Sequence, residues 1–187
     1  VVSHKVINRS AQNWQGQMFG QIKRDNSEDP GKSSQGIFTL GTFLGGAWGT
    51  PDEQYNKLKF ANFTDEKLNV EAKGGWVAVV QHYFVSAWIP GNLKLTQANG
   101  QPYTAKLESR QSADQMNIIG FTSPTINVPA GTVAELDATF YSGPKGQSEV
   151  KDLAAGLNQT VDYGWVWAIA ELLFVGLQVF HKIIGKW

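Results

Sequence analysis

The sequence has no cysteine among its 187 residues. Disulfides, thiolate metal sites and cysteine nucleophiles are therefore excluded. An excess of charge of one sign is also lacking, because 16 lysine and arginine residues balance 16 aspartate and glutamate residues. A nucleic-acid binder normally carries a basic surplus that attracts phosphates, so we expect no nucleic-acid partner. A chain of this length buries about 70 % of the surface that its unfolded form exposes, so one core can be stable without crosslinks or metal.

The motifs of common enzyme classes are missing or incomplete. Residues 31–33 spell the end of a phosphate-binding loop, but Asn26 stands where this motif needs a glycine five positions earlier. The histidines stand without a second histidine or a carboxylate at metal-ligand spacing: His4, His82 and His181. We therefore expect no catalytic residues, no cofactor and no metal. His82 falls inside a strand pattern, which favours a packing role.

One pair of carboxylates keeps an enzymatic interpretation open. Glu135 and Asp137 are two residues apart in a predicted strand, so both would lie on one face. General acid–base catalysis would need one carboxyl group of this pair to be held in an apolar pocket.

The first ten residues do not resemble a signal peptide. Residues 1–10 contain no apolar run behind a basic cluster, which a signal peptide would have. The chain starts at Val1 with no initiator methionine, so we expect it to be a part of a longer protein.

Short strand patterns fill most of the chain. From Val1 to about Phe140, apolar and polar residues alternate in runs divided by Gly, Asn, Asp and Pro, as in half-buried antiparallel strands. The predicted runs are 14–22, 37–44, 55–60, 68–72, 76–89, 103–109, 116–121 and 133–141. The polar residues 24–36 predict a mobile loop, and Gly45 and Gly46 are expected to end the second run. Turn signals spaced by roughly 10 to 15 residues favour a sandwich or barrel over βαβ units.

The pattern changes after Gly143. Residues 148–157 predict a short helix, with Ser148 as its N-cap and Gly156 near its end. We therefore divide the chain into a β-region, residues 1–143, and a C-terminal helical region, residues 144–187.

The last segment is strongly apolar. Within residues 165–180 only Glu171 and Gln178 are neither apolar nor glycine, and a helical wheel places both on one narrow stripe with Lys182. A helix of this kind with tryptophans near its ends is typical of a segment that lies in the bilayer interface. A core helix packed on the sheet fits the same periodicity. The absence of any later β-pattern favours membrane contact.

Three blocks carry a resemblance to a known family. They are TPDEQYNKLKF at 50–60, GGWVAVVQHYFVSAWIP at 74–90 and TVDYGWVWAIAELLF at 160–174. In this order they resemble the large periplasmic domain of bacterial members of the YidC/Oxa/Alb family of membrane protein insertases. One departure is Leu172, where many relatives have proline, so a helix through this point should be less interrupted here.

The resemblance implies a mainly β fold: a twisted two-sheet antiparallel β-supersandwich of mutarotase-like architecture, followed by C-terminal helices. It implies that the insertase core and the transmembrane segments lie outside this chain. The residues implied to meet the membrane are Trp165, Trp167, Leu172, Leu173, Phe174, Phe180, Lys182, Lys186 and Trp187. Those of the family blocks with an implied structural role are Trp76, Tyr83, Trp88, Pro90, Asp162 and Tyr163.

The function implied is that of an accessory, non-enzymatic module on the periplasmic side of the Gram-negative inner membrane. Its implied partners are the Sec translocon and its accessory subunits, nascent inner-membrane proteins, and the membrane surface through the C-terminal helix. Two alternatives remain: a sugar-binding or sugar-epimerising mutarotase-like domain, and a passive structural spacer.

Overall fold

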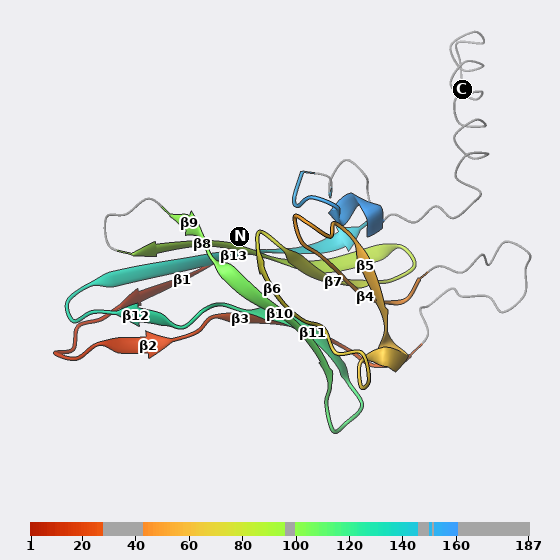
Figure 1. The fold of residues 1–187 in the computed structure, drawn as a ribbon, viewed down its shortest axis with the longest axis horizontal. Helices are drawn as coiled ribbons and strands as arrows, with labels where there is room; N and C mark the ends of the chain where they lie inside the picture. Colours follow the sequence, from red (N-terminus) through yellow and green to blue (C-terminus); the bar gives the residue numbers. More distant parts are fainter. Residues whose placement is uncertain (28–42, 96–99, 146–149, 151, 161–187) are drawn as a thin grey trace, which may run out of the picture.

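The computed structural model describes residues 1–27, 43–95, 100–145, 150 and 152–160. Strands dominate this part of the chain (Figure 1). In order, the elements are β1 (Val2–Ile7), β2 (Trp14–Gly16), β3 (Phe19–Arg24), β4 (Gly45–Gly49), β5 (Asn56–Lys59), the 3₁₀-helix η1 (Phe60–Asn62), β6 (Asn69–Lys73), β7 (Trp76–Val80), β8 (Phe84–Leu95), β9 (Gln101–Pro102), β10 (Thr104–Gln111), β11 (Asn117–Thr122), β12 (Ile126–Val128), β13 (Val133–Pro144) and the 3₁₀-helix η2 (Leu157–Thr160).

Among the described residues, the strands form three antiparallel sheets. The largest has the order β1-β13-β8-β7-β4-β5, with β9 added beside β8. The second has the order β3-β11-β10-β6, and the third pairs β12 with β2. The predicted mainly β, antiparallel fold is therefore confirmed.

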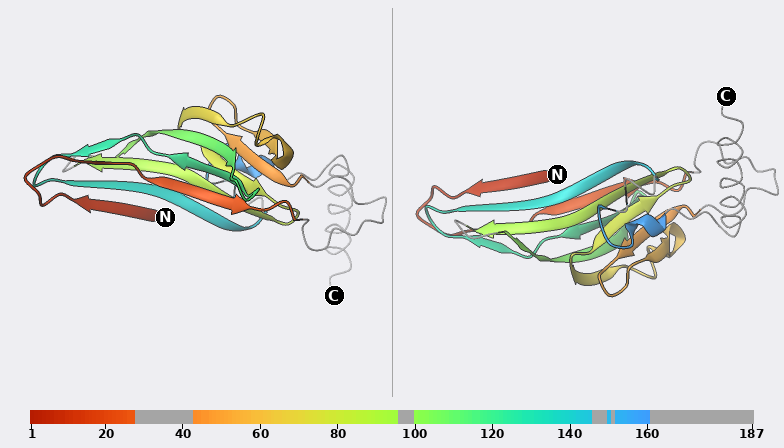
Figure 2. Two further views of the ribbon diagram at one scale, coloured as in Figure 1. Left: turned by 90° about the horizontal axis from the view of Figure 1, so that it is seen from below. Right: turned by 90° about the horizontal axis from the view of Figure 1, so that it is seen from above.

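The two-stranded sheet continues the four-stranded one after a bend. β2 leads into β3, and β11 leads into β12, so the same two chain segments pair on both sides of the bend. At the bend the buried Ser123 donates its backbone N–H to the Met18 carbonyl at 2.8 Å and accepts the Met18 N–H on its hydroxyl at 2.9 Å. The Ser123 hydroxyl thus takes the place of a ladder carbonyl at the bend, just before Pro124. With the two-stranded sheet continuing the four-stranded one, the molecule has two main layers (Figure 2).

The main core lies between these layers. β10 shows how the sequence builds it, because Ala105, Leu107 and Ser109 are buried while the residues between them face outward. Phe63 and Phe121 fill the centre and are fully buried. The period-2 pattern predicted for this strand is therefore confirmed.

β7 is buried on both faces. Val77 and Val79 belong to the core between the layers. Trp76, Ala78 and Val80 face the other side, where Val150 and Leu157 cover them in a second apolar cluster. A strand buried on two sides carries an unbroken apolar run, which explains the sequence WVAVV.

Two predicted strand boundaries are wrong. The run 76–89 is a hairpin, and His82 lies in its turn, where its ring contacts Tyr83 edge-on at a centroid distance of 4.0 Å. β4 starts at Gly45, the glycine pair that was expected to end a strand. A side chain at Gly46 would meet the Phe63 ring at 2.8 Å, so the large core aromatic takes the space that a side chain would occupy.

The predicted helix 148–157 falls partly outside the described residues. Residues 152–156 form turns, and η2 begins at Leu157, where the predicted helix was expected to end. Gly156 has φ +81°, a left-handed conformation that interrupts any helix between them. These residues pack on the large sheet, and the domain division at residue 143 stays a prediction.

Candidate peptide-binding cleft

A cleft of about 250 Å³ opens along one side of the sandwich, between the edge strand β1 and the edge formed by β2 and β3. β1 pairs only with β13, and β3 only with β11, among the described strands. The two layers therefore have no strand closing this side. The lining residues are His4, Val6, Trp14, Gln17, Met18, Phe19, Ile126 and Leu136.

The floor of the cleft is apolar and its rim is aromatic. Leu136 and Met18 are buried at its base. Trp14 and Phe19 stand at the rim with 42 % and 65 % of their surface exposed. Because side chains alternate along a strand, His4 and Val6 of β1 face this cleft together. The lining contains no carboxylate, so the cleft suits an apolar, uncharged segment.

The backbone of β1 adds hydrogen-bonding groups beside the cleft. The N–H of Asn8 donates to the carbonyl of Thr132 at 3.0 Å. Since N–H groups alternate in direction along an antiparallel strand, those of Ser3, Lys5 and Ile7 point away from β13. Within the described ranges, nothing pairs with β1 on that side. This edge can accept an added strand by main-chain hydrogen bonds.

Three aromatic rings form a group outside the cleft, from β8, β11 and β13. Trp88 packs at 5.8 Å from the Phe121 ring and at 4.7 Å from the Phe140 ring, measured between centroids. A side chain at Gly20 would meet Trp88 at 2.8 Å, so glycine is what lets β3 approach this tryptophan. Phe140, at the outer side of this group, is 41 % exposed.

The two carboxylates considered for acid–base chemistry have structural partners. Glu135 accepts a hydrogen bond from the Ser3 hydroxyl at 2.8 Å. Asp137 lies in a β-bulge and accepts the Asn92 N–H on its side chain at 2.7 Å. Its carbonyl accepts the hydroxyl of Tyr103 at 3.1 Å, and burial raises the pKa of Tyr103 to about 12.

A second cavity, of about 360 Å³, lies near the β4–β5 turn. Trp48 and Val70 form part of its wall, and Asp52, Glu53 and Glu71 are on its rim. These carboxylates are in exposed positions. The cavity lies against β6, an edge strand of the four-stranded sheet, and the carboxylates on its rim distinguish it from the first cleft.

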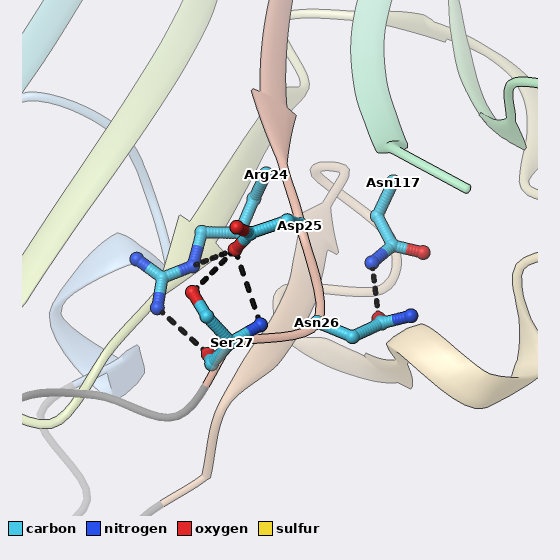
Figure 3. Close-up of polar contacts among 5 residues, drawn as sticks. All are labelled: Arg24, Asp25, Asn26, Ser27 and Asn117. Carbon is cyan, nitrogen blue, oxygen red and sulfur yellow. Dashed lines mark hydrogen bonds and ion pairs between the residues drawn. The ribbon is translucent and has the colours of Figure 1, made fainter. Parts of the chain in front are cut away.

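A compact polar turn follows β3 (Figure 3). The Arg24 guanidinium lies 4.0 Å from the Asp25 carboxylate and donates to the Ser27 carbonyl at 3.1 Å. The hydroxyl and N–H of Ser27 donate to the same carboxylate and lower the pKa of Asp25, with a smaller contribution from Arg24. Asn117 of β11 donates to the side-chain oxygen of Asn26 at 2.6 Å, which ties the turn to the sheet.

The family-block residues have different positions. Trp76 is 1 % exposed and donates its indole N–H to the Ala155 carbonyl at 2.9 Å. Pro90 is buried in β8 beside the Asp137 bulge, a place where a strand tolerates proline. Tyr83 is 64 % exposed in the hairpin turn, so its surroundings are solvent rather than core.

Several candidate residues lie outside the described part of the chain: His181, residues 28–42, Asp162, Tyr163, Trp165, Trp167, Leu172, Leu173, Phe174, Phe180, Lys182, Lys186 and Trp187. The described residues contain no helix long and apolar enough to cross a membrane. They also hold no group of three or more side chains that could bind a metal ion.

The cleft residues of β1 were not singled out from the sequence. Val2, His4 and Val6 alternate with Ser3 and Lys5, which is a strand signal. The histidine at position 4 weakens this strand signal, because the other residues of the alternating series are apolar. Trp14 and Met18 fall in a predicted run, but their place at an open sheet edge depends on topology.

The fold and cleft define an antiparallel β-sandwich domain with an apolar groove at two free sheet edges. Residues 1–175 match the family model of the YidC periplasmic domain. The chain belongs to this family.

Relatives named "Membrane protein insertase YidC" match the whole chain. The protein of Stutzerimonas stutzeri is 44 % identical over 186 residues, covering 100 % of this chain and 32 % of that protein. Those of Pseudomonas aeruginosa (42 %, 30 % of that protein) and Azotobacter vinelandii (40 %, 31 % of that protein) also match over 186 residues and 100 % of this chain. The chain therefore spans about a third of the length of these relatives.

Proposed function

We propose that this chain is an accessory binding module of a membrane protein insertase, on the periplasmic side of a Gram-negative inner membrane. It binds extended segments, either of nascent inner-membrane proteins or of accessory subunits of the Sec translocon. It acts by binding and not by catalysis. Family membership supports the setting, and the cleft supports the mode of binding.

The observation that carries the proposal is the apolar cleft beside the free edge of β1. An extended segment added to β1 would receive hydrogen bonds from Ser3, Lys5 and Ile7. Every second side chain of that segment would then enter the cleft lined by Met18 and Leu136. Affinity comes from the backbone, and selection for apolar side chains comes from the cleft.

Proline at Lys5 tests this arrangement. Because the N–H of Lys5 points away from β13, Lys5→Pro removes a donor from the free edge and leaves the β1–β13 ladder in place. Lys5→Ala is the matched control, since it removes the charge and keeps the N–H. Each variant is made in the full-length insertase with a photocrosslinking residue at Phe19 on the cleft rim, and crosslinks to a nascent membrane protein and to translocon subunits are compared.

We expect Lys5→Pro to reduce the crosslinks at least several-fold, and Lys5→Ala to leave them near wild type. Equal yields from both variants would show that the β1 edge takes no part. Crosslinks only to another segment of the same insertase would show that the edge is covered within its own protein, which overturns the proposal.

The segment after Thr160 lies outside the described residues. On its sequence we propose that residues 163–187 lie along the membrane surface, since Trp165, Trp167 and Trp187 stand near the ends of an apolar stretch with lysines late in it. Oriented circular dichroism of this peptide on anionic vesicles should show a helix parallel to the surface. A helix along the membrane normal, or no binding, would contradict this.

A further inference from the structure

The β7–β8 hairpin turn carries two neighbouring exposed aromatic side chains, Tyr83 and Phe84, and we call this end of the sandwich the hairpin end. Tyr83 is 64 % exposed and Phe84 53 %. Hairpin turns are normally polar, because their backbone and side chains meet water. Aromatic side chains that remain exposed at a turn indicate a surface that meets something less polar than water.

The backbone holds this surface in a fixed position. The N–H of Gln81 donates to the Phe84 carbonyl at 2.9 Å and closes the turn. The N–H of Lys145 donates to the Tyr83 carbonyl at 2.9 Å, so the turn is tied to the end of β13. Phe84 stands opposite Pro144 in the ladder, which leaves an apolar pair at the tip. The aromatic rings are therefore presented on paired strands.

The hairpin and the last part of β13 contain no acidic residue, whereas the segment packed on the outer sheet face carries the exposed Asp152. The sequence has no Asp or Glu between Glu71 and Glu108, nor between Asp137 and Glu149. β3 also runs toward this end of the molecule (Figure 2). The carboxylate that follows it, Asp25, is paired with Arg24 at 4.0 Å. An anionic surface would meet no net repulsion from the hairpin or from this ion pair.

The described chain stops on the outer face of β7 and β8, the two strands that the hairpin turn joins. Leu157 and Val150 share one apolar cluster with Val80 and Val85, the residues that flank the hairpin turn. The next residues in sequence, 161–187, contain two acids, Asp162 and Glu171. The chain thus continues into its most apolar segment from the face of the sheet that β7 and β8 form.

We propose that the hairpin end contacts the surface of a lipid bilayer, with Tyr83 and Phe84 at the level of the headgroups. Tyrosine favours this level because its ring can enter the apolar boundary while its hydroxyl stays hydrated, and the ring of Phe84 adds apolar area at the same boundary. The contact rests on the membrane setting proposed above and is independent of the β1 edge. It orients the sandwich, since the β8 strand then runs away from the membrane.

The absence of cysteine makes a direct test possible. Tyr83→Cys in the complete chain gives a single site for an environment-sensitive fluorophore and keeps Phe84. Leu95→Cys is the matched control, because Leu95 is 43 % exposed and ends the same strand. Position 83 directly precedes β8 and position 95 ends it, so the two sites are about 40 Å apart along the strand, beyond the reach of an interfacial contact. Both proteins are mixed with vesicles of phosphatidylglycerol and phosphatidylethanolamine, with and without lipids that carry a quencher near the headgroup.

We expect the label at position 83 to shift to the blue and to be quenched by the headgroup quencher, and the label at 95 to stay water-like. An unlabelled Phe84→Ser variant should bind the vesicles roughly five-fold more weakly, because part of a buried aromatic area is lost. Leu95→Ser should bind like the wild type.

A water-like signal at position 83 while the protein is vesicle-bound would overturn the proposal, since binding would then come from another segment. Equal shifts at both positions would also overturn it, because they would indicate non-specific adsorption. Neither result bears on the β1 edge, which the crosslinking experiment tests separately.

Discussion

Gly156 fixes the segment that connects the sandwich to the C-terminal residues. Its φ is +81°, and a Cβ at this position would overlap the carbonyl oxygen of Gln54. The neighbouring Ala155 carbonyl accepts the indole N–H of Trp76 at 2.9 Å. Leu157, the next residue, is fully buried on the outer face of the large sheet. We therefore predict that Gly156→Ala displaces this segment from the sheet.

The chain offers a matched control for the magnitude. Gly131 also has positive φ, +73°, but a Cβ there would meet nothing within 4 Å. Left-handed backbone costs an alanine about 1–2 kcal/mol. Alanine also restricts the unfolded chain more than glycine does, which offsets about 0.4–1 kcal/mol of this cost. Gly131→Ala should therefore lower the free energy of unfolding by about 1 kcal/mol.

Gly156→Ala carries the same backbone cost and the overlap with Gln54 in addition. Moving the segment to relieve the overlap loses the Trp76–Ala155 hydrogen bond, worth about 1 kcal/mol. It also exposes much of Leu157, worth about 2 kcal/mol. We therefore expect Gly156→Ala to cost about 3 kcal/mol more than Gly131→Ala.

Urea denaturation followed by tryptophan fluorescence measures this difference. A gap of this size should separate the two midpoints by about 1 M or more. Should the segment detach without global unfolding, hydrogen exchange at the amides of Leu157 and Gln159, which donate to Ala154 and Gly156 at 3.2 and 3.0 Å, will be faster only in Gly156→Ala. If the two variants match in both measurements, the overlap with Gln54 has no energetic effect and the reasoning fails.

Two further predictions concern the core. Burial is the main cause that raises the pKa of Tyr103 to about 12 from its ordinary value of 10.0. The protonated hydroxyl therefore contributes its full stability below pH 10, and this contribution is lost as the pH rises through 12. Tyr103→Phe should remove this part of the alkaline loss, measured as the free energy of unfolding against pH, and an unchanged alkaline slope would contradict it. Phe63→Ala should cost about 3–5 kcal/mol in the same denaturation assay, because Phe63 is fully buried and packs edge-on against Phe60 at 5.4 Å. A cost below 1 kcal/mol would show that the core closes around the gap.

Period-2 alternation predicts the strands of this fold because most of them have one buried face. β10 follows it directly. The pattern cannot divide the run from Trp76 to Ile89, because β7 is buried on both faces and the hairpin turn carries aromatic residues in place of turn residues. β4 is missed for a different reason: its glycines make room for Phe63 and Trp76, whose positions the local sequence does not reveal.

The cleft depends on topology more than on local pattern. His4 faces Met18 across it only because β1 and β2 end as edges of different sheets. β1 and β2 are close together in the sequence. However, β1 pairs with β13 and β2 pairs with β12, each more than 100 positions away. Composition shows that aromatic residues are numerous. It does not show which of them are exposed, nor that Trp14 and Phe19 line one groove.

The arrangement of β7 links the two surfaces that we propose to be functional. Its inner side chains, Val77 and Val79, belong to the core that ends at the cleft, and its outer ones hold the segment with Leu157. The same strand leads into the hairpin end through Val80. Close-packed cores transmit displacement because they have little free volume. A partner that spreads the layers at the cleft would therefore act on β7, which also positions the hairpin end and the segment with Leu157.

Gly156→Ala tests this link as well. It should change the signal of the label at position 83 on vesicles. Gly131→Ala, at the far end of the sandwich, should leave that signal unchanged.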